Sequence, residues 1–167
     1  MQSMARFEDA ARRMAAECYA NRVTAAANWL SKIYDEALSS AGIVVSQMKL
    51  LIATALFGEG GAPMGAIAKV LEMDPTTMAR RLQPLEVAGL VRVARSPEDA
   101  RVRHVVLTRA GERKLEEVLP LWERAQNIVR TRIGEKRAND LRRMLRQLVN
   151  SRRSLYTQPK RPGLATR

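Results

Sequence analysis

Apolar residues recur at helical spacing through the N-terminal part of the chain. They follow one another at steps of four, three, four, seven and four residues and are Phe7, Ala11, Met14, Cys18, Ala25 and Trp29. This spacing places them on one face of a long helix, with charged residues between them. Gly42, which follows Ser-Ser-Ala, predicts that the helix ends just before it.

Three shorter helices are predicted next. An almost continuous apolar segment, residues 46–57, predicts a helix buried on several sides, with Ser46 as its candidate N-cap and the glycines of GEGGAP as its end. Residues 64–74 predict a helix of about two turns. Asp74 and Pro75 then start another helix, because aspartate caps free backbone N–H groups and proline at the first position loses no hydrogen bond.

The helix that begins at Pro75 has one apolar and one polar face. The side chains expected to face inward recur at spacings of four and three and are Met78, Leu82 and Leu85. A helical projection gives the opposite face three polar residues with two more on its flanks: Thr76, Arg80 and Gln83, flanked by Thr77 and Arg81.

A β-hairpin and two long helices complete the predicted elements. The β-branched runs LVRVA and VRHVVLT are joined by RSPEDAR, whose Ser-Pro and Asp residues favour a turn, so a hairpin with a basic tip is expected. Thr108 is expected to cap a long helix with apolar positions at Leu115, Leu119, Trp122 and Val129. The stripe of the last helix is Leu141, Met144, Leu145, Leu148 and Leu155, and residues 157–167 form a loose basic tail.

Composition supports a mainly helical protein. Hydrophobic residues make up 46% of the 167 residues, enough to bury a core, but aromatic residues make up only 4%. Alanine, leucine and arginine dominate, which favours helices over a sandwich or barrel. The single cysteine excludes a disulfide-stabilised secreted scaffold, and no window approaches the ~20 apolar residues of a membrane span. We therefore expect a cytoplasmic protein without membrane contacts.

The positive charge is concentrated in two segments. The chain carries 29 Lys+Arg against 17 Asp+Glu, a net charge of +12. Residues 75–113 contribute +4 and residues 130–167 contribute +10, whereas residues 1–74 and 114–129 contribute −1 each. Localised positive charge is typical of polyanion binders, because cations placed on phosphates release condensed counterions. An arginine-rich solvated surface is the alternative at this point.

The predicted order of helix, turn, helix and hairpin is that of a winged helix-turn-helix. In that motif the second helix, the recognition helix, enters the major groove of DNA, and the hairpin reaches the adjacent backbone or minor groove. Arg80 can make bidentate contacts with guanine and Gln83 with adenine. Thr76 and Thr77 can hold a phosphate together with the backbone N–H groups at the helix N-terminus. The alternative is an ordinary amphipathic helix with a solvated polar face.

Three motifs then occur in the order and at the spacing of one family. They are Leu85-Glu86-x-x-Gly89-Leu90-Val91 beside the recognition helix, Asp99-x-Arg101 in the hairpin and Leu107-Thr108-x-x-Gly111 before the next helix. Through them, and through YDEAL followed by Gln47, the sequence resembles the MarR-type transcriptional regulators over residues 5–155. The resemblance implies a mainly α fold with a small β-hairpin, in which a winged helix-turn-helix lobe is joined to a helical dimerisation region.

The resemblance also implies a homodimer that represses transcription from a pseudo-palindromic operator on double-stranded DNA. The dimerisation region is expected at residues 1–40 and 112–156, the DNA-binding lobe at 41–111 and the basic tail at 157–167. The apolar stripes near both chain ends support this interpretation, because they are longer than one small lobe can cover.

The hairpin adds DNA contacts to those of the recognition helix. The expected residues are Arg95, Asp99, Arg101 and Arg103. In the family Arg101 would enter the minor groove and Asp99 would brace the hairpin. The residues alone agree, because a carboxylate in a turn can pin the backbone and a neighbouring charge.

A small effector, often phenolic or acidic, is the remaining partner that the resemblance implies. It would bind in a cleft between the dimerisation helices and the lobe and release the DNA. The residues expected near this cleft are Trp29, Ile33, Met48, Leu51 and Trp122. Taken singly, each of them fits an ordinary place in the core better than a place in the cleft.

Two other functions stay open. Some relatives sense oxidants through a cysteine on the first helix, which makes Cys18 a candidate, although its place in the apolar stripe favours packing. A basic RNA-binding protein is the second alternative. Such proteins stack bases on aromatic residues of a sheet or groove, whereas the seven aromatic residues here fall mostly on helix stripes.

No enzyme is predicted, because the sequence has no triad-like spacing, no P-loop and no G-x-G-x-x-G. His104 and the one cysteine cannot form an ordinary zinc site within a chain, so neither a metal nor a cofactor is expected.

The excess positive charge of residues 130–167 is not explained by the resemblance. Its charges could be solvated, could attract an acidic effector, or could reach phosphates through Lys160, Arg161 and Arg167, which is the interpretation we favour.

Overall fold

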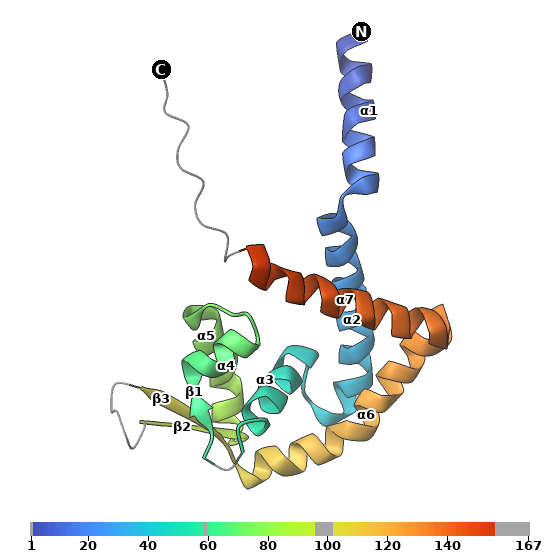
Figure 1. Cartoon of the computed structure of the whole chain (residues 1–167). Coiled ribbons are helices and arrows are strands. Elements are labelled where there is room, and N and C mark those ends of the chain that lie inside the picture. The colour runs from blue at the N-terminus through green and yellow to red at the C-terminus, as the bar shows by residue number, and fades with distance from the viewer. Residues whose placement is uncertain (1, 59, 96–101, 156–167) are drawn as a thin grey trace, which may run out of the picture. The chain divides into compact units, whose positions relative to one another are not determined.

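The structure, a computed structural model, describes residues 2–58, 60–95 and 102–155. Among these residues, side chains are described for those numbered from 6 to 151. Its elements in chain order are α1 (Gln2–Glu17), α2 (Tyr19–Leu38), the 3-10 helix η1 (Ser39–Ala41), α3 (Val45–Ala55), β1 (Ala62–Pro63), α4 (Met64–Val70), α5 (Pro75–Val87), β2 (Val91–Arg95), β3 (Arg103–Leu107), α6 (Arg109–Ile133) and α7 (Glu135–Leu155) (Figure 1). The predicted mainly helical fold with a small β-hairpin is confirmed. Residues 1–125 and 126–167 form two compact units.

The N-terminal helix is broken, where one unbroken helix was expected. Cys18 has φ −68° and ψ 112°, an extended conformation that ends α1 and starts α2. The break frees the carbonyl of Ala16, and the Arg22 side chain donates to it from Nε and Nη2, both at 3.2 Å. The expected end before Gly42 is correct, since Gly42 has φ 67° and follows η1.

The start of α3 differs from the expected one. Ser46 is not the cap, because the helix begins at Val45. A more distant residue stabilises this start: Asp35 of α2 accepts a hydrogen bond from the backbone N–H of Val45 at 2.7 Å. The Gln47 side chain accepts another from Val44 N–H at 3.0 Å. The prediction that this helix is buried on several sides is correct, with Leu50 and Leu51 both fully buried.

The two short helices meet across a tight turn as expected. Asp74 caps α5, and its Oδ1 accepts a hydrogen bond from Thr77 N–H at 2.9 Å while Pro75 occupies the first helical position. The turn before it contains Glu72 with φ 55°, the left-handed region. The three apolar residues of α5 that were expected to face inward do so, with exposed fractions of 2% or less: Met78, Leu82 and Leu85.

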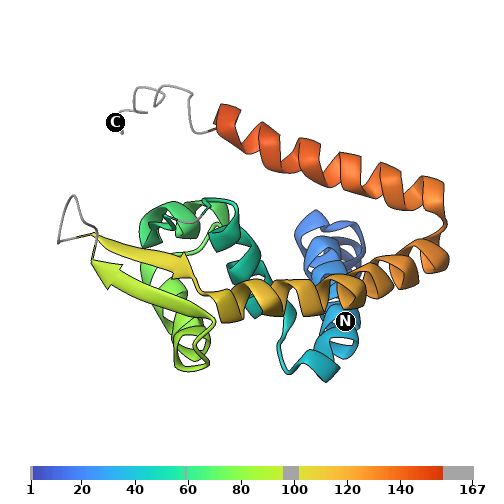
Figure 2. The ribbon, with the colours of Figure 1, turned by 90° about the horizontal axis from the view of Figure 1, so that it is seen from below.

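The hairpin is confirmed and has a third strand that the sequence pattern missed. β2 pairs with β3 antiparallel from Val91↔Leu107 to Arg95↔Arg103. On the other side of β3 lies the two-residue strand β1, with Ala62 opposite Val105. Close approach needs glycine here, because a Cβ on Gly61 would lie 2.3 Å from the carbonyl oxygen of Val105. β3 leads directly into α6 (Figure 2).

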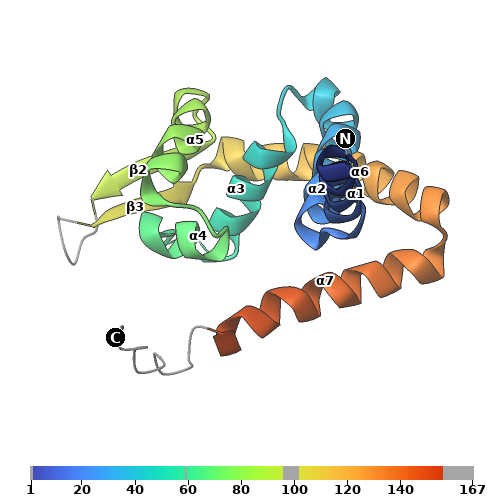
Figure 3. The ribbon, with the colours of Figure 1, turned by 90° about the horizontal axis from the view of Figure 1, so that it is seen from above.

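The core of the first unit lies where α3, α4 and α5 gather beside the sheet (Figure 3). The side chains buried there include Leu38, Leu50, Leu51, Ile67, Met78, Leu82, Leu85, Val91, Val105 and Val118. Because α5 contributes three of these residues, its position relative to the strands is fixed by packing.

Several apolar side chains outside the core are exposed in the single chain. On α1 and α2 they include Phe7, Met14, Tyr19 and Trp29, and on α7 they include Met144, Leu145, Leu148 and Val149. Within the described residues no single helix is long and apolar enough to cross a membrane. Among these residues, one pair of helical segments, Tyr19–Ala41 and Val45–Ala55, is together long and apolar enough for a membrane span, and it is bent by 79° at the break between the two segments.

Candidate nucleic-acid interface and ligand pocket

The polar face of α5 is presented to solvent. Thr76, Arg80 and Gln83 are exposed, as the helical projection predicted, because the apolar residues between them are buried in the core. Within the described residues, neither Arg80 nor Arg81 forms an ion pair. This face therefore offers hydrogen-bond donors that are not used inside the protein.

A hollow of about 390 Å³ separates this face from the hairpin. Four of the residues that line it are polar or charged: Arg80, Gln83 and Glu86 of α5, and Arg103 of β3. Arg103 belongs to the same face of the sheet as Val105, which packs on the helices, since side chains alternate along a strand. The hairpin thus brings its cation to the side of the recognition helix.

Two arginines face each other at the end of the hairpin where the connecting loop begins. Arg95 of β2 is the direct partner of Arg103 of β3, and both side chains are exposed. Like charges placed directly opposite each other destabilise a strand pair. A bound polyanion removes this repulsion, so the arrangement is suited to contact with phosphate groups.

The flank of α5 that carries Thr77 and Arg81 borders a different hollow, of about 540 Å³, toward α2 and α3. Here Asp74 organises the helix N-terminus. A side-chain hydrogen bond from Thr77, together with the bond from the Thr77 backbone, holds the pKa of Asp74 below its ordinary value. The Asp74 carboxylate is thus stabilised in its charged form.

The base of the hairpin is tied to the start of α6. The Thr108 hydroxyl donates to the carbonyl of Gly89 at 2.6 Å and accepts from Gly111 N–H at 3.1 Å, while Thr108 N–H donates to Leu90 O at 3.1 Å. A Cβ on Gly111 would lie 2.1 Å from the Leu90 carbonyl oxygen. Gly89 has φ 68°, which favours glycine. The first residues after α5 are therefore fixed to α6.

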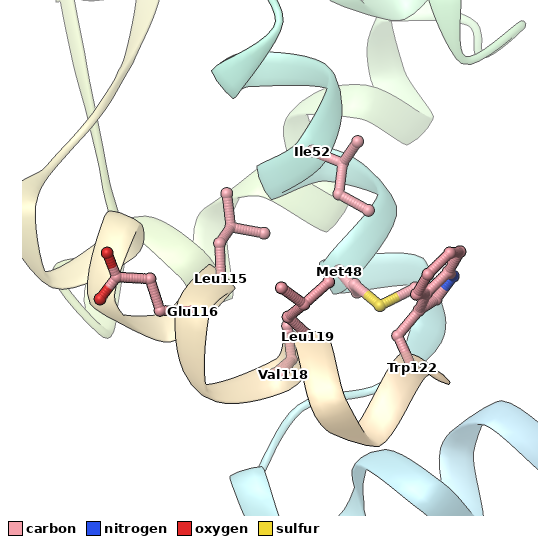
Figure 4. Close-up of a pocket in the computed structure, with 7 residues that line it drawn as sticks. All are labelled: Met48, Ile52, Leu115, Glu116, Val118, Leu119 and Trp122. Atoms are coloured by element: carbon pink, nitrogen blue, oxygen red, sulfur yellow. The ribbon is translucent and has the colours of Figure 1, made fainter. Parts of the chain in front are cut away.

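A second candidate site is an apolar pocket of about 420 Å³ between α3 and α6. Its lining is Met48 and Ile52 of α3 and Leu115, Glu116, Val118, Leu119 and Trp122 of α6. Figure 4 shows the sulfur of Met48 beside the Trp122 ring, whereas Glu116 lies at the edge with its carboxylate pointing away from both. A pocket of this size and character is typical of sites for small organic molecules.

Comparisons with known proteins agree with this geometry. The family model described as "MarR family" matches residues 46–102, from the start of α3 through the hairpin. The transcriptional regulator MosR of M. tuberculosis, in a crystal structure with DNA, is 28% identical, with a TM-score of 0.70 over 83% of this chain and 98% of that chain. Residues 46–102 thus resemble the MarR family.

Two further solved structures share the fold. MepR of S. aureus, solved with DNA, is 19% identical, with a TM-score of 0.69 over 80% of this chain and 97% of that chain. CouR of Rhodococcus jostii RHA1, solved with p-coumaroyl-CoA, is 20% identical, with a TM-score of 0.66 over 80% of this chain and 92% of that chain. No curated protein matches in a sequence search.

The structure assembles only part of the expected DNA-contacting set. Arg80, Gln83 and Arg103 line one hollow, with Arg95 next to Arg103. Thr77 and Arg81 border the other hollow, and Asp99 and Arg101 lie outside the described residues. Glu86, which lines the first hollow, was noticed in the sequence only as a motif residue. Its spacing of three from Gln83 could have placed it there.

Only some of the residues that were expected near the effector cleft line one pocket. Met48 and Trp122 line the apolar pocket, but Trp29, Ile33 and Leu51 do not belong to its lining. Ile33 and Leu51 are buried in the chain, and Trp29 is 36% exposed. The remaining lining residues were missed, because α3 and α6 are far apart in the sequence and only packing brings them together.

Cys18, the residue of the redox alternative, does not pack in the core of the chain. It is half-buried at the break between α1 and α2. The side chains that surround it on α1, from Arg6 to Glu17, are all exposed. The expectation that Cys18 packs as a small hydrophobe is therefore wrong for the single chain, because the helix that would cover it is itself exposed.

Proposed function

We propose that this chain is a ligand-responsive repressor that binds a pseudo-palindromic operator on double-stranded DNA as a homodimer. In this proposal α5 enters the major groove, the hairpin reaches the adjacent backbone or minor groove, and a small molecule in the apolar pocket weakens the complex. Each part rests on a different feature of the described residues.

One observation carries the DNA-binding part: Arg80 and Gln83 of α5 lie with Arg103 of the hairpin around one hollow. Arginine and glutamine are the side chains that make bidentate contacts with guanine and adenine in the major groove. The arginine pair beside the connecting loop of the hairpin supplies positive charge for the phosphates. MosR, the 28% identical relative, has been crystallised in complex with DNA.

The dimer part rests on the exposed apolar residues of α1, α2 and α7. Phe7 and Met14 are 75% and 72% exposed, and Leu148 is 60% exposed. Large apolar side chains at helical spacing lose solvent contact when a second copy covers them. A two-fold dimer would also match the symmetry of a pseudo-palindromic site.

The effector part rests on the position of the apolar pocket. One of its walls is α6, whose first residue follows Thr108, the residue bonded to the end of the recognition helix. A ligand that moves α6 would change how α5 and the hairpin are held. CouR, a protein of the same fold, has been solved with p-coumaroyl-CoA.

Selection of a binding site from a random duplex library tests the proposal. Enrichment of a pseudo-palindrome is the expected result, and preference for single-stranded RNA would favour the basic RNA-binding alternative instead. Arg80→Ala should then lose about 1–3 kcal/mol of binding free energy and relax the preference at one base pair per half-site.

Arg92→Ala is the matched control for that substitution. Arg92 is exposed on β2, but it alternates with Val91 and Val93 and so faces away from α5. It should leave the base preference unchanged. If Arg80→Ala also left the preference unchanged, the proposed base contact would be wrong.

A further inference from the structure

Lys114 is the one charged residue on the inward face of α6 between residues 110 and 125, all of which the structure describes. The other buried or half-buried residues of this stretch are uncharged: Ala110, Gly111, Leu115, Val118, Leu121, Trp122 and Ala125. Their spacing of three and four residues places Lys114 on the same stripe. An apolar side chain would fill this position without the unfavourable loss of water around an ammonium group. A lysine here therefore indicates a specific contact.

The ammonium group of Lys114 joins α6 to the end of α2. Its Nζ donates a hydrogen bond to the carbonyl of Ala41 at 3.0 Å, across 73 residues of chain. It also contacts the carboxylate of Glu117 at 2.6 Å. The Lys114 side chain is 21% exposed and that of Glu117 is 48% exposed, so the bond to Ala41 is the more enclosed of the two contacts.

Ala41 lies at the joint between α2 and the helices that carry α5. It is the last residue of η1, and carbonyl groups at a helix end need partners from outside the helix. The chain then passes through Gly42, which has φ 67°, and enters α3 at Val45. The first half of α6 runs from the sheet to this joint (Figure 1). Because Thr108 bonds the start of the same helix to Gly89, α6 is tied to both the joint and the end of α5.

Apolar packing alone leaves the angle at this joint less well defined. Leu38 and Ala41 are buried in the core of the first unit, but apolar contacts are non-directional. A hydrogen bond weakens steeply when its donor and acceptor are misaligned. The bond from Lys114 therefore restricts rotation of α2 against α3 and α5.

We propose that Lys114 is a positioning residue that sets the separation between the two DNA half-sites. This inference rests on the proposed function, in which a second copy covers α1, α2 and α7 and each copy presents α5 to one half-site. In such a dimer, a change in the angle between α2 and α3 moves both copies of α5. One additional base pair moves the half-sites apart by about 3.4 Å and turns them by about a tenth of a helical turn, so one angle matches one separation.

Duplexes with one base pair inserted or removed between the half-sites test the inference in the full chain. The reference duplex is the pseudo-palindrome that the parent chain selects. The measured quantity is the spacing penalty, which is the ratio of the dissociation constants for the altered and the reference duplex. This ratio does not depend on the fraction of protein that is folded, because the same sample binds both duplexes. Loss of stability alone would therefore leave it unchanged.

Lys114→Met keeps a long side chain but removes the hydrogen-bond donor. The parent chain should bind the altered duplexes at least about tenfold more weakly, and Lys114→Met should lower this penalty by about the tenfold factor of one charge-assisted hydrogen bond. Lys114→Leu should have the same effect, and it provides the measurement if the methionine variant does not fold. Lys114→Arg retains a cationic donor and should retain the penalty.

Two neighbours of Lys114 provide matched controls. Arg113 is exposed and has no ion-pair partner among the described residues, so Arg113→Met should leave the penalty unchanged. Glu117→Gln removes the ion pair with Lys114 but keeps the bond to Ala41, and it should also leave the penalty unchanged. A penalty lowered as much by Glu117→Gln as by Lys114→Met would overturn the role of the Ala41 bond.

The remaining outcomes separate this inference from the proposed function. If the parent chain prefers one spacing and the Lys114 variants keep the same penalty, the inference is wrong and the proposed function stands. An equal loss of affinity for every duplex in these variants would assign Lys114 to stability alone and would also overturn the inference. A parent chain that binds a single half-site as tightly as the pseudo-palindrome would overturn the proposed function, and the inference with it.

Discussion

Asp74 determines where the recognition helix begins, and its ionisation should make the stability of the chain depend on pH. Its pKa is lowered in the folded state by the side-chain and backbone hydrogen bonds from Thr77. A carboxyl group of this kind stabilises the fold above its ordinary pKa of 3.8, and the stabilisation is lost as the pH falls through the lower folded value.

Thermal unfolding of Asp74→Asn and Asp74→Ala between pH 7 and pH 3 measures this contribution. Asparagine still accepts a capping hydrogen bond but cannot titrate, so its melting temperature should fall less on acidification than that of the parent chain. Alanine removes the cap and should lower the melting temperature already at pH 7. Parallel pH profiles for the parent chain and Asp74→Asn would contradict the assigned role.

Sequence patterns predict single residues well where the determining contacts are local. The cap at Asp74 and the inward face of Met78 and Leu82 follow from neighbours within one or two helical turns. The N-terminus of α3 does not, because Asp35, ten residues earlier, bonds to Val45. That contact depends on how α2 and α3 pack, and it displaces Ser46 from the role that its residue type favours.

At the scale of elements, Thr108 links the end of the recognition helix to α6. Thr108→Val keeps the side-chain shape but removes the bond to Gly89 and the acceptor for Gly111 N–H. It should destabilise the fold by about 1–2 kcal/mol, because the substitution removes a cap and a part-buried hydrogen bond together. The effector should also release DNA less efficiently.

Thermal unfolding and DNA affinity with and without ligand measure both effects. Thr108→Ser retains the hydroxyl and serves as the control, so it should behave like the parent chain. A Thr108→Val chain with unchanged coupling between ligand and DNA would show that the link does not transmit the signal.

Element boundaries show what a pattern cannot predict. The apolar stripe continues through Cys18, and neither glycine nor proline marks the break that the structure places there. β1 contains only Ala62 and Pro63, too few residues for an alternating pattern. The apolar pocket needs Met48 and Trp122 to meet across more than seventy residues of chain, and only the packed fold determines that they do.

For the whole molecule, the exposed face of α7 predicts how the dimer can be disrupted. Met144→Glu combined with Leu148→Glu places charges on two side chains that are 56% and 60% exposed in the single chain. Burial of such a side chain contributes about 1.5–3 kcal/mol, and a buried unpaired charge is unfavourable. Sedimentation at micromolar concentration should show monomers.

Gln147→Glu is the control for this pair, because Gln147 is exposed on the same helix but is not one of its apolar side chains. It should sediment as the parent dimer does. A monomeric parent chain that still bound its operator tightly would contradict the dimer itself.

The basic tail predicts a salt dependence of DNA binding. Residues 157–167 lie outside the described residues, and they carry Lys160, Arg161 and Arg167. Truncation after Tyr156 should make the slope of log K against log salt shallower by about 0.9 for each phosphate that the tail neutralises in the full chain. The preferred DNA sequence should not change. An unchanged slope with an intact dimer would assign these charges to a solvated surface.

The exposure of α1 has a consequence for turnover in the cell. Every described side chain from Arg6 to Glu17 is exposed, and a helix of 16 residues is only marginally stable in water without packing. If a second copy supplies that packing, subunits at low concentration have frayed N-termini, which are the first sites that proteases attack. Scarce regulator is then degraded faster than abundant regulator, so the lifetime of the protein rises with its own copy number.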